Sequence, residues 1–169
     1  MKLKTLTRMG LLSAVALIMF MVEAQIPLPM PAPGIKLGLA NIVTVFAVWI
    51  MGPWQAVGIV GVRVFLGAVF SGNFGTIFYS AAGGALAIVA TIGLKKILKQ
   101  NQIWVAGSLG AAAHSIGQMA AAMAISATPG LAAYLPVMIA CGMVTGLFTG
   151  FCAQLLVNRG KDFWKTTFK

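Results

Sequence analysis

Long apolar runs alternate with short stretches rich in proline, glycine or charge along the whole chain. The apolar runs cover approximately residues 9–24, 37–51, 54–70, 76–94, 103–125 and 133–157. A transmembrane helix needs about 20 apolar residues, and somewhat fewer where neighbouring helices shorten the crossing. The pattern therefore predicts one all-α transmembrane domain over residues 1–169, a bundle of six membrane-spanning helices.

The boundary between the second and third runs decides whether five or six helices form. One helix over residues 37–70 would be about 50 Å long at about 1.5 Å per residue, which is too long for a hydrocarbon core of about 30 Å. Gly52 and Pro53 interrupt the apolar residues between the two runs. Two helices are therefore expected here.

Most basic residues form three clusters, which lie before the first run, after the fourth and after the last. They are Lys2, Lys4, Arg8, Lys95, Lys96, Lys99, Arg159, Lys161, Lys165 and Lys169. Six spans place all three clusters on one side, which the positive-inside rule makes cytoplasmic, whereas five spans place the terminal clusters on opposite sides. Both termini are therefore predicted to be cytoplasmic, in the plasma membrane. A cleavable signal peptide ending near Ala24 is the alternative for the first span.

The composition excludes a soluble protein. Of the 169 residues, 60% are hydrophobic and 8% are charged, and the mean hydropathy is +0.96, whereas a soluble domain has about 25% charged residues. The formal net charge of +10 does not indicate nucleic-acid binding, because the basic residues lie between apolar runs rather than along one face. The expected surrounding is the lipid bilayer.

The scarcity of reactive side chains argues against an enzyme. Glu23 and Asp162 are the only acidic residues, which excludes a two-carboxylate mechanism, a magnesium–diphosphate site and an aspartate-rich prenyl-transfer motif. No P-loop is present, and one histidine with Cys141 and Cys152 makes no metal, haem or iron–sulfur site. We expect no catalytic residue, metal or cofactor. Active transport would need energy from other subunits or from an ion gradient, with Glu23 as the sole candidate for proton coupling.

Polar side chains inside apolar helices are candidates for a binding site, because each is costly unless it faces a cavity or a partner. In the six-span topology these residues converge on the outer half of the bilayer. They are Lys36, Asn41, Arg63, Asn73, His114 and Gln118. We predict that they bind a small organic substrate that is anionic or rich in hydrogen-bonding groups, with Glu23 as a possible counter-charge.

Each candidate also has a purely structural interpretation. Arg63 could pair with Glu23, since buried charges are normally compensated. His114 could hydrogen-bond between helices, Lys36 could extend to the membrane surface, and Asn41 could bridge two helices. The sequence leaves these alternatives open.

Rows of small residues predict close packing between helices. Gly142, Gly146 and Gly150 are spaced four residues apart on the last span, and Gly10 and Ala14 have the same spacing on the first. We expect the last row to pack within the monomer and the first to dock a partner subunit.

Five segments of the chain resemble a known family. They are PGIKLGLANIV (33–43), GPWQA (52–56), SGNFGT (71–76), HSIGQ (114–118) and VTGLFTG (144–150). In these segments the chain resembles the Gx transporter family, also labelled heptaprenyl diphosphate synthase component I, over roughly residues 14–156. Ser115 stands where that family often has asparagine. The resemblance favours an uncleaved first span.

The Gx transporter family is similar to the substrate-binding S components of energy-coupling factor (ECF) transporters. This resemblance implies an S-component-like bundle of six helices with an outward pocket, capped by the loop after the first helix, here the proline-rich residues 25–36. It also implies that separate ATPase subunits and a transmembrane T subunit provide energy and dock through small residues of the first helix. The predicted function is therefore that of an S component of an importer for a small organic molecule.

Two other functions remain open. The chain could be a non-transporting membrane partner of isoprenoid, quinone or flavin-linked redox machinery that recruits soluble enzymes by its basic inner face. It could also be an ion-coupled carrier that works alone through Glu23. Co-purification with ATPase and T subunits, with a prenyl synthase or flavoprotein, or with neither separates the three.

Overall fold

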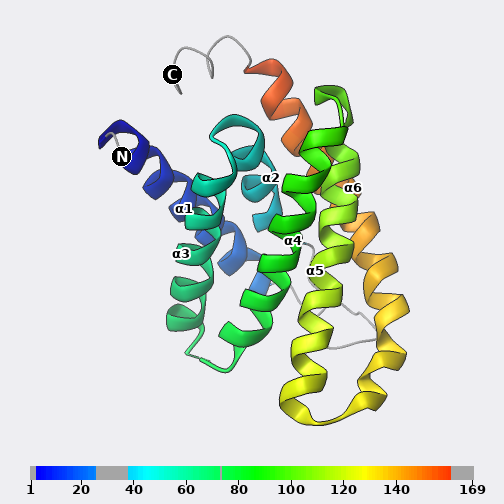
Figure 1. The fold of residues 1–169 in the computed structure, drawn as a ribbon. Helices are drawn as coiled ribbons and strands as arrows, with labels where there is room; N and C mark the ends of the chain where they lie inside the picture. Colours follow the sequence, from blue (N-terminus) through cyan, green and yellow to red (C-terminus); the bar gives the residue numbers. More distant parts are fainter. Residues whose placement is uncertain (1–2, 26–37, 73, 161–169) are drawn as a thin grey trace.

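The computed structural model describes residues 3–25, 38–72 and 74–160 (Figure 1). The predicted site residues Lys36 and Asn73, and most of the proline-rich connector, lie outside these ranges. The described residues form six α-helices and two short 3₁₀ helices, without a β-strand among them, which confirms the all-α class. Their bounds are α1 Leu3–Ala24, α2 Ala40–Ile50, α3 Pro53–Ser71, α4 Thr76–Ile97, η1 Gln100–Gln102, α5 Ile103–Ser126, η2 Pro129–Tyr134 and α6 Leu135–Arg159.

Four helical stretches in the described part are long and apolar enough to cross a membrane. They are Leu3–Ala24, Pro53–Ser71, Ile77–Ile97 and Pro129–Arg159. Helix α5 has 24 residues, but it is less apolar because it carries His114, Gln118 and several serines and glycines. Its position between α4 and α6 shields these residues.

The second apolar run folds differently from the expected span over residues 37–51. Helix α2 has only 11 residues, about 16 Å of helix, and is too short to cross a hydrocarbon core of about 30 Å by itself. Nearly all of its side chains are buried by the surrounding helices. The described residues of this run form a short interior helix, and the count of six membrane spans stays a prediction.

The predicted break between the second and third runs is confirmed. Gly52 has φ +107°, a backbone conformation that side chains other than glycine rarely adopt. Pro53 follows at the first position of α3, where its missing N–H costs nothing. The chain therefore reverses between α2 and α3 instead of continuing as one long helix.

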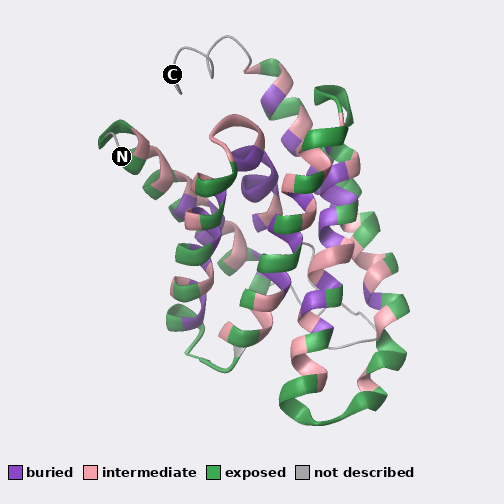
Figure 2. Cartoon of the chain, in the orientation of Figure 1, coloured by how far each residue is buried: buried purple, intermediate pink, exposed green. Residues whose placement is uncertain are grey.

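The helices form a bundle in which α2 lies between α1 and α3 on one side and α4, α5 and α6 on the other (Figure 1). The start of α1, the α2–α3 and α4–α5 connections and the end of α6 lie at one end of the bundle. Buried residues gather on the facing sides of the helices, and large hydrophobic side chains cover much of the outside (Figure 2). Such an apolar exterior suits contact with lipid.

Candidate functional site

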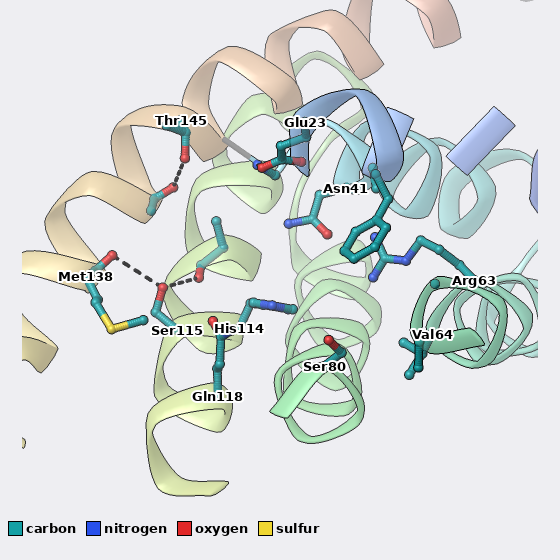
Figure 3. Close-up of a pocket in the computed structure, with 17 residues that line it drawn as sticks. Glu23, Asn41, Arg63, Val64, Ser80, His114, Ser115, Gln118, Met138 and Thr145 are labelled. Carbon is teal, nitrogen blue, oxygen red and sulfur yellow. Dashed lines mark hydrogen bonds between the residues drawn. The ribbon is translucent and has the colours of Figure 1, made fainter. Parts of the chain in front are cut away.

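All six helices contribute to one cavity (Figure 3). Its lining residues lie in the half of the bundle away from the described chain ends (Figure 1). Its volume is about 80 Å³. Its wall combines apolar side chains with the side chains of Glu23, Asn41, Arg63, Ser80, His114, Ser115, Gln118 and Thr145. A cavity with several polar groups inside an apolar bundle can hold a small polar guest or water.

The structure brings together the predicted site residues that it describes. Asn41, Arg63, His114 and Gln118 all line the cavity, and Glu23 lines it beside them. These residues come from α2, α3, α5 and α1, so their proximity depends on the packing of the bundle. Their role in binding a ligand remains a prediction.

Glu23 caps the start of helix α2. Its side chain is 4% exposed, and its two carboxylate oxygens accept hydrogen bonds from the backbone N–H groups of Gly38, at 2.5 Å, and Leu39, at 3.0 Å. The first N–H groups of a helix lack partners within it and carry a partial positive charge, which a carboxylate stabilises. Glu23 therefore holds the start of α2 against the end of α1.

Lys95 caps the opposite end of α2. Its ammonium donates a hydrogen bond to the carbonyl of Val48 at 2.7 Å and lies 3.4 Å from the carbonyl of Trp49. The last carbonyls of a helix carry a partial negative charge that a cation stabilises. A carboxylate from α1 and an ammonium from α4 thus hold the two ends of the short, buried helix.

Arg63 is the most deeply buried cation of the cavity. It lies in α3 and is 8% exposed, and its guanidinium makes no hydrogen bond with any residue that the structure describes. Glu23 attracts its charge electrostatically. The side chain points from α3 into the space that Asn41, Ser80 and His114 also face (Figure 3).

Two glycines make room for the side chains of the cavity. A Cβ on Gly67, one turn after Arg63, would lie 3.1 Å from Cε1 of Phe20, so this ring packs directly on the α3 backbone. A Cβ on Gly83 of α4 would lie 2.9 Å from Cε1 and Nε2 of His114. The imidazole therefore lies against α4 at a position where any larger residue would displace it.

Helices α5 and α6 touch through their backbones. A Cβ on Gly107 would lie 2.5 Å from Cα of Gly150 and 2.6 Å from the carbonyl oxygen of Gly146. The predicted glycine row of α6 thus faces α5, and a Cβ on Gly142 would meet the Ser115 hydroxyl at 2.9 Å. The first-helix pair, Gly10 and Ala14, instead lies on an exposed face of α1.

The Ser115 hydroxyl links α5 to α6 at the cavity wall. It lies 3.2 Å from the carbonyl oxygen of Ala111 and 3.3 Å from that of Met138, and it can donate a shared hydrogen bond to both. Thr145 on α6 donates to the carbonyl oxygen of Gly142 at 3.1 Å. Both hydroxyls keep lone pairs that can accept hydrogen bonds within the cavity.

Sequence reasoning missed several lining residues, among them Phe20, Ser80, Ser115 and Thr145. The hydroxyl of a serine or threonine can donate a hydrogen bond to a carbonyl of its own helix. Its presence in an apolar run is therefore weak evidence for a binding site. For Ser115, its position next to His114 in the sequence could have indicated that it lines the same site. In the described ranges, no three side chains of histidine, cysteine or acidic type gather into a metal site.

Comparison of the sequence with known protein families shows to which family the chain belongs. The pattern of the family described as heptaprenyl diphosphate synthase component I matches residues 12–156, most of the chain. The chain belongs to the heptaprenyl diphosphate synthase component I family. No curated protein and no solved structure matches it. The matched range contains every residue of the described cavity, from Phe20 to Thr145.

Proposed function

We propose that the chain is a membrane subunit that captures a small organic molecule for import, in the manner of an ECF S component. The observation that carries this proposal is the cavity, in which a buried arginine and several polar side chains face one space inside an apolar bundle. Polar groups at such depth are costly, and binding of a guest is the use that offsets the cost.

In the proposed orientation the protein lies in the plasma membrane, and the basic end of the bundle faces the cytoplasm. Lys4, Arg8, Lys96 and Arg159 lie at or near the end that carries the described chain ends. By the positive-inside rule this end is cytoplasmic. The cavity then lies in the outer half of the membrane, where a substrate arriving from outside would enter. All six helices belong to the membrane domain, with α2 shielded inside it.

We propose that energy for import comes from partner subunits; the lack of a P-loop in the sequence supports this, since the chain has no motif of its own for ATP. We assign this role to separate ATPase subunits and a T subunit, with the exposed Gly10 and Ala14 face of α1 as the docking surface. Small residues permit the close helix contact that such docking needs. Gly10→Phe should abolish co-purification with these subunits, whereas Val89→Phe, on the exposed face of α4, should leave it intact.

Mass spectrometry of the purified full-length protein tests the capture function directly. A retained small molecule should be found with the wild type and lost from Ser80→Leu, whose added carbons fill the cavity. Ala81→Leu is the matched control, because Ala81 is the exposed neighbour on the same helix. Retention by Ser80→Leu, or no retained or added small molecule bound by the wild type, would contradict the proposal.

A second candidate follows from the family description. In this role the chain would be a non-transporting membrane partner of isoprenoid, quinone or flavin-linked redox machinery; the family description, which names a component of a prenyl diphosphate synthase, supports it. We propose that the chain itself is not an enzyme, since its sequence holds only two acidic residues. Recovery with a prenyl synthase or flavoprotein and without ATPase subunits would favour this second role.

A further inference from the structure

The unused hydrogen-bonding capacity of the cavity identifies the chemistry of its guest. Arg63 is buried and charged, and its guanidinium carries five N–H donors and no acceptor. None of these donors bonds to a residue that the structure describes. A guanidinium in this state is suited to a planar anion that accepts two parallel hydrogen bonds.

Glu23 does not provide that anion. Its carboxylate oxygens each accept a backbone N–H at the start of α2, from Gly38 and Leu39. The positive end of the α2 dipole also stabilises the carboxylate charge. Glu23 attracts Arg63 electrostatically, yet its oxygens are directed at the helix, so the donors of Arg63 remain available on the cavity side.

The rest of the lining fits a small molecule with one charged and one neutral polar end. Asn41, Ser80 and Gln118 line the same cavity, and their side chains make no hydrogen bond with the described residues. Each can both donate and accept a hydrogen bond. Phe20, packed on Gly67 one turn from Arg63, adds an apolar side that keeps water away and strengthens electrostatic attraction.

The size of the cavity limits the guest. Its volume is about 80 Å³, well below the cavity of about 150 Å³ that admits benzene. One cation, already attracted by one carboxylate, suits a single negative charge better than a double one. These limits favour a carboxylate with a short carbon chain over a phosphate or an aromatic acid.

We infer that the cavity binds a compact monocarboxylate, with its carboxylate on the Arg63 guanidinium and its polar substituent facing Asn41 and Gln118. This inference rests on the proposed capture function and names its substrate class. A carboxylate entering the site completes the hydrogen bonds of Arg63 and compensates its charge in the same step. The neutral amide of the same shape cannot accept two hydrogen bonds from the guanidinium and does not compensate its charge.

Calorimetry with pairs of isosteric ligands tests this inference on the full-length protein in nanodiscs. The pairs are acetate with acetamide, propionate with propionamide, and lactate with lactamide; phosphate and benzoate complete the panel. Each acid should bind at least about tenfold more tightly than its amide, since hydrogen bonds to a charged group are the stronger ones. Amides that bind as tightly as the acids, or phosphate or benzoate as the tightest ligand, would overturn the inference.

Substitutions locate the charge that is recognised. Arg63→Gln should weaken acid binding by about 10- to 100-fold and leave the weak amide binding unchanged. Arg63→Lys should weaken acid binding less, because lysine keeps the positive charge and loses only the two parallel N–H donors of the guanidinium. The matched control is Arg159→Gln, at the far end of α6, which should leave all affinities unchanged. Full acid affinity in a folded Arg63→Gln protein would overturn the inference.

The wild-type panel keeps the test decisive where Arg63→Gln fails to fold, because the acid–amide comparison needs no variant. Gln118→Leu then serves as the second variant, with an expected loss of preference for lactate over propionate. The two proposals fail separately. Tight binding of a neutral molecule in a Ser80-dependent way would overturn the carboxylate inference and leave capture standing, whereas binding of no small molecule would remove both.

Discussion

The two walls of the cavity are held by different forces. Helices α5 and α6 meet backbone to backbone at Gly107, Gly146 and Gly150. Helix α2 on the other wall is short, and Glu23 and Lys95 hold its ends through hydrogen bonds to backbone groups. One wall thus depends on shape and the other on charge.

This difference has a consequence for how each wall responds to change. Backbone contacts between glycines are lost as soon as a Cβ is added, since close-packed interiors tolerate little extra volume. A helix held by charges at its ends responds to the loss of charge, and it lies next to Arg63, whose charge a guest would neutralise. We therefore expect the α5–α6 wall to act as a fixed support and the α2 wall to carry the electrostatic response.

The largest effect is expected from Gly107→Ala. The added Cβ would lie 2.5 Å from Cα of Gly150, so the two helices must separate, at a cost of about 3 kcal/mol. Thermal unfolding in detergent measures the loss. Gly93→Ala is the control, because nothing lies within 4 Å of its Cβ and alanine favours a helix. Equal unfolding temperatures for the two variants would contradict the backbone contact.

Glu23→Gln tests the charge at the start of α2. The amide keeps the shape and one acceptor oxygen but loses the charge, which should cost about 2 kcal/mol. Hydrogen exchange should show faster exchange in α2 and unchanged exchange in α6. Equal protection of α2 in wild type and variant would show that the carboxylate does not hold this helix.

Lys95→Gln tests the opposite end of α2. It removes the charged donor to the Val48 carbonyl, and we expect a loss of about 1 kcal/mol in unfolding free energy. Lys96→Gln is the matched control, because Lys96 is exposed on the same turn. A similar effect of both substitutions would mean that the basic charge of this end matters, and not the bond to α2.

The smallest effect is expected from Ser115→Ala. It removes one hydrogen bond between α5 and α6, and such bonds within membranes contribute about 0.6 kcal/mol on average. Ser126→Ala is the control, since Ser126 is exposed and its hydroxyl donates to Ala122 of its own helix. A loss for Ser115→Ala as large as that for Gly107→Ala would show that the polar link, and not the glycine contact, supports this wall.

Much of the fold could be predicted from the apolar runs alone. The bounds of α3, α5 and α6 differ from the predicted runs by no more than two residues, because long apolar periodic segments form helices in almost any surrounding. The run over residues 37–51 forms a shorter helix, Ala40–Ile50, and its crossing of the membrane stays a prediction. Its composition resembles a lipid-exposed span, whereas its neighbours enclose it as a short interior helix, and composition does not distinguish lipid from apolar protein.

The candidate site shows a similar division. The polar residues in apolar runs were visible one by one, and Asn41, Arg63, His114 and Gln118 proved to line one cavity. The capping of α2 was not visible, because Glu23 and Lys95 act on backbone groups of another helix. Ser80 and Thr145 were also missed, since a hydroxyl in a helix reveals nothing of the direction in which it points.

By itself the sequence determined that the chain folds as apolar helices and which side chains are too polar for lipid, since both follow from the transfer of each residue out of water. It also determined the family, because a family is recognised from residue patterns along the chain and needs no tertiary structure. Only the tertiary structure decided which polar groups face one another and which are already satisfied. That outcome depends on how helices distant in sequence pack, where a glycine permits contact or a charge meets the end of a helix.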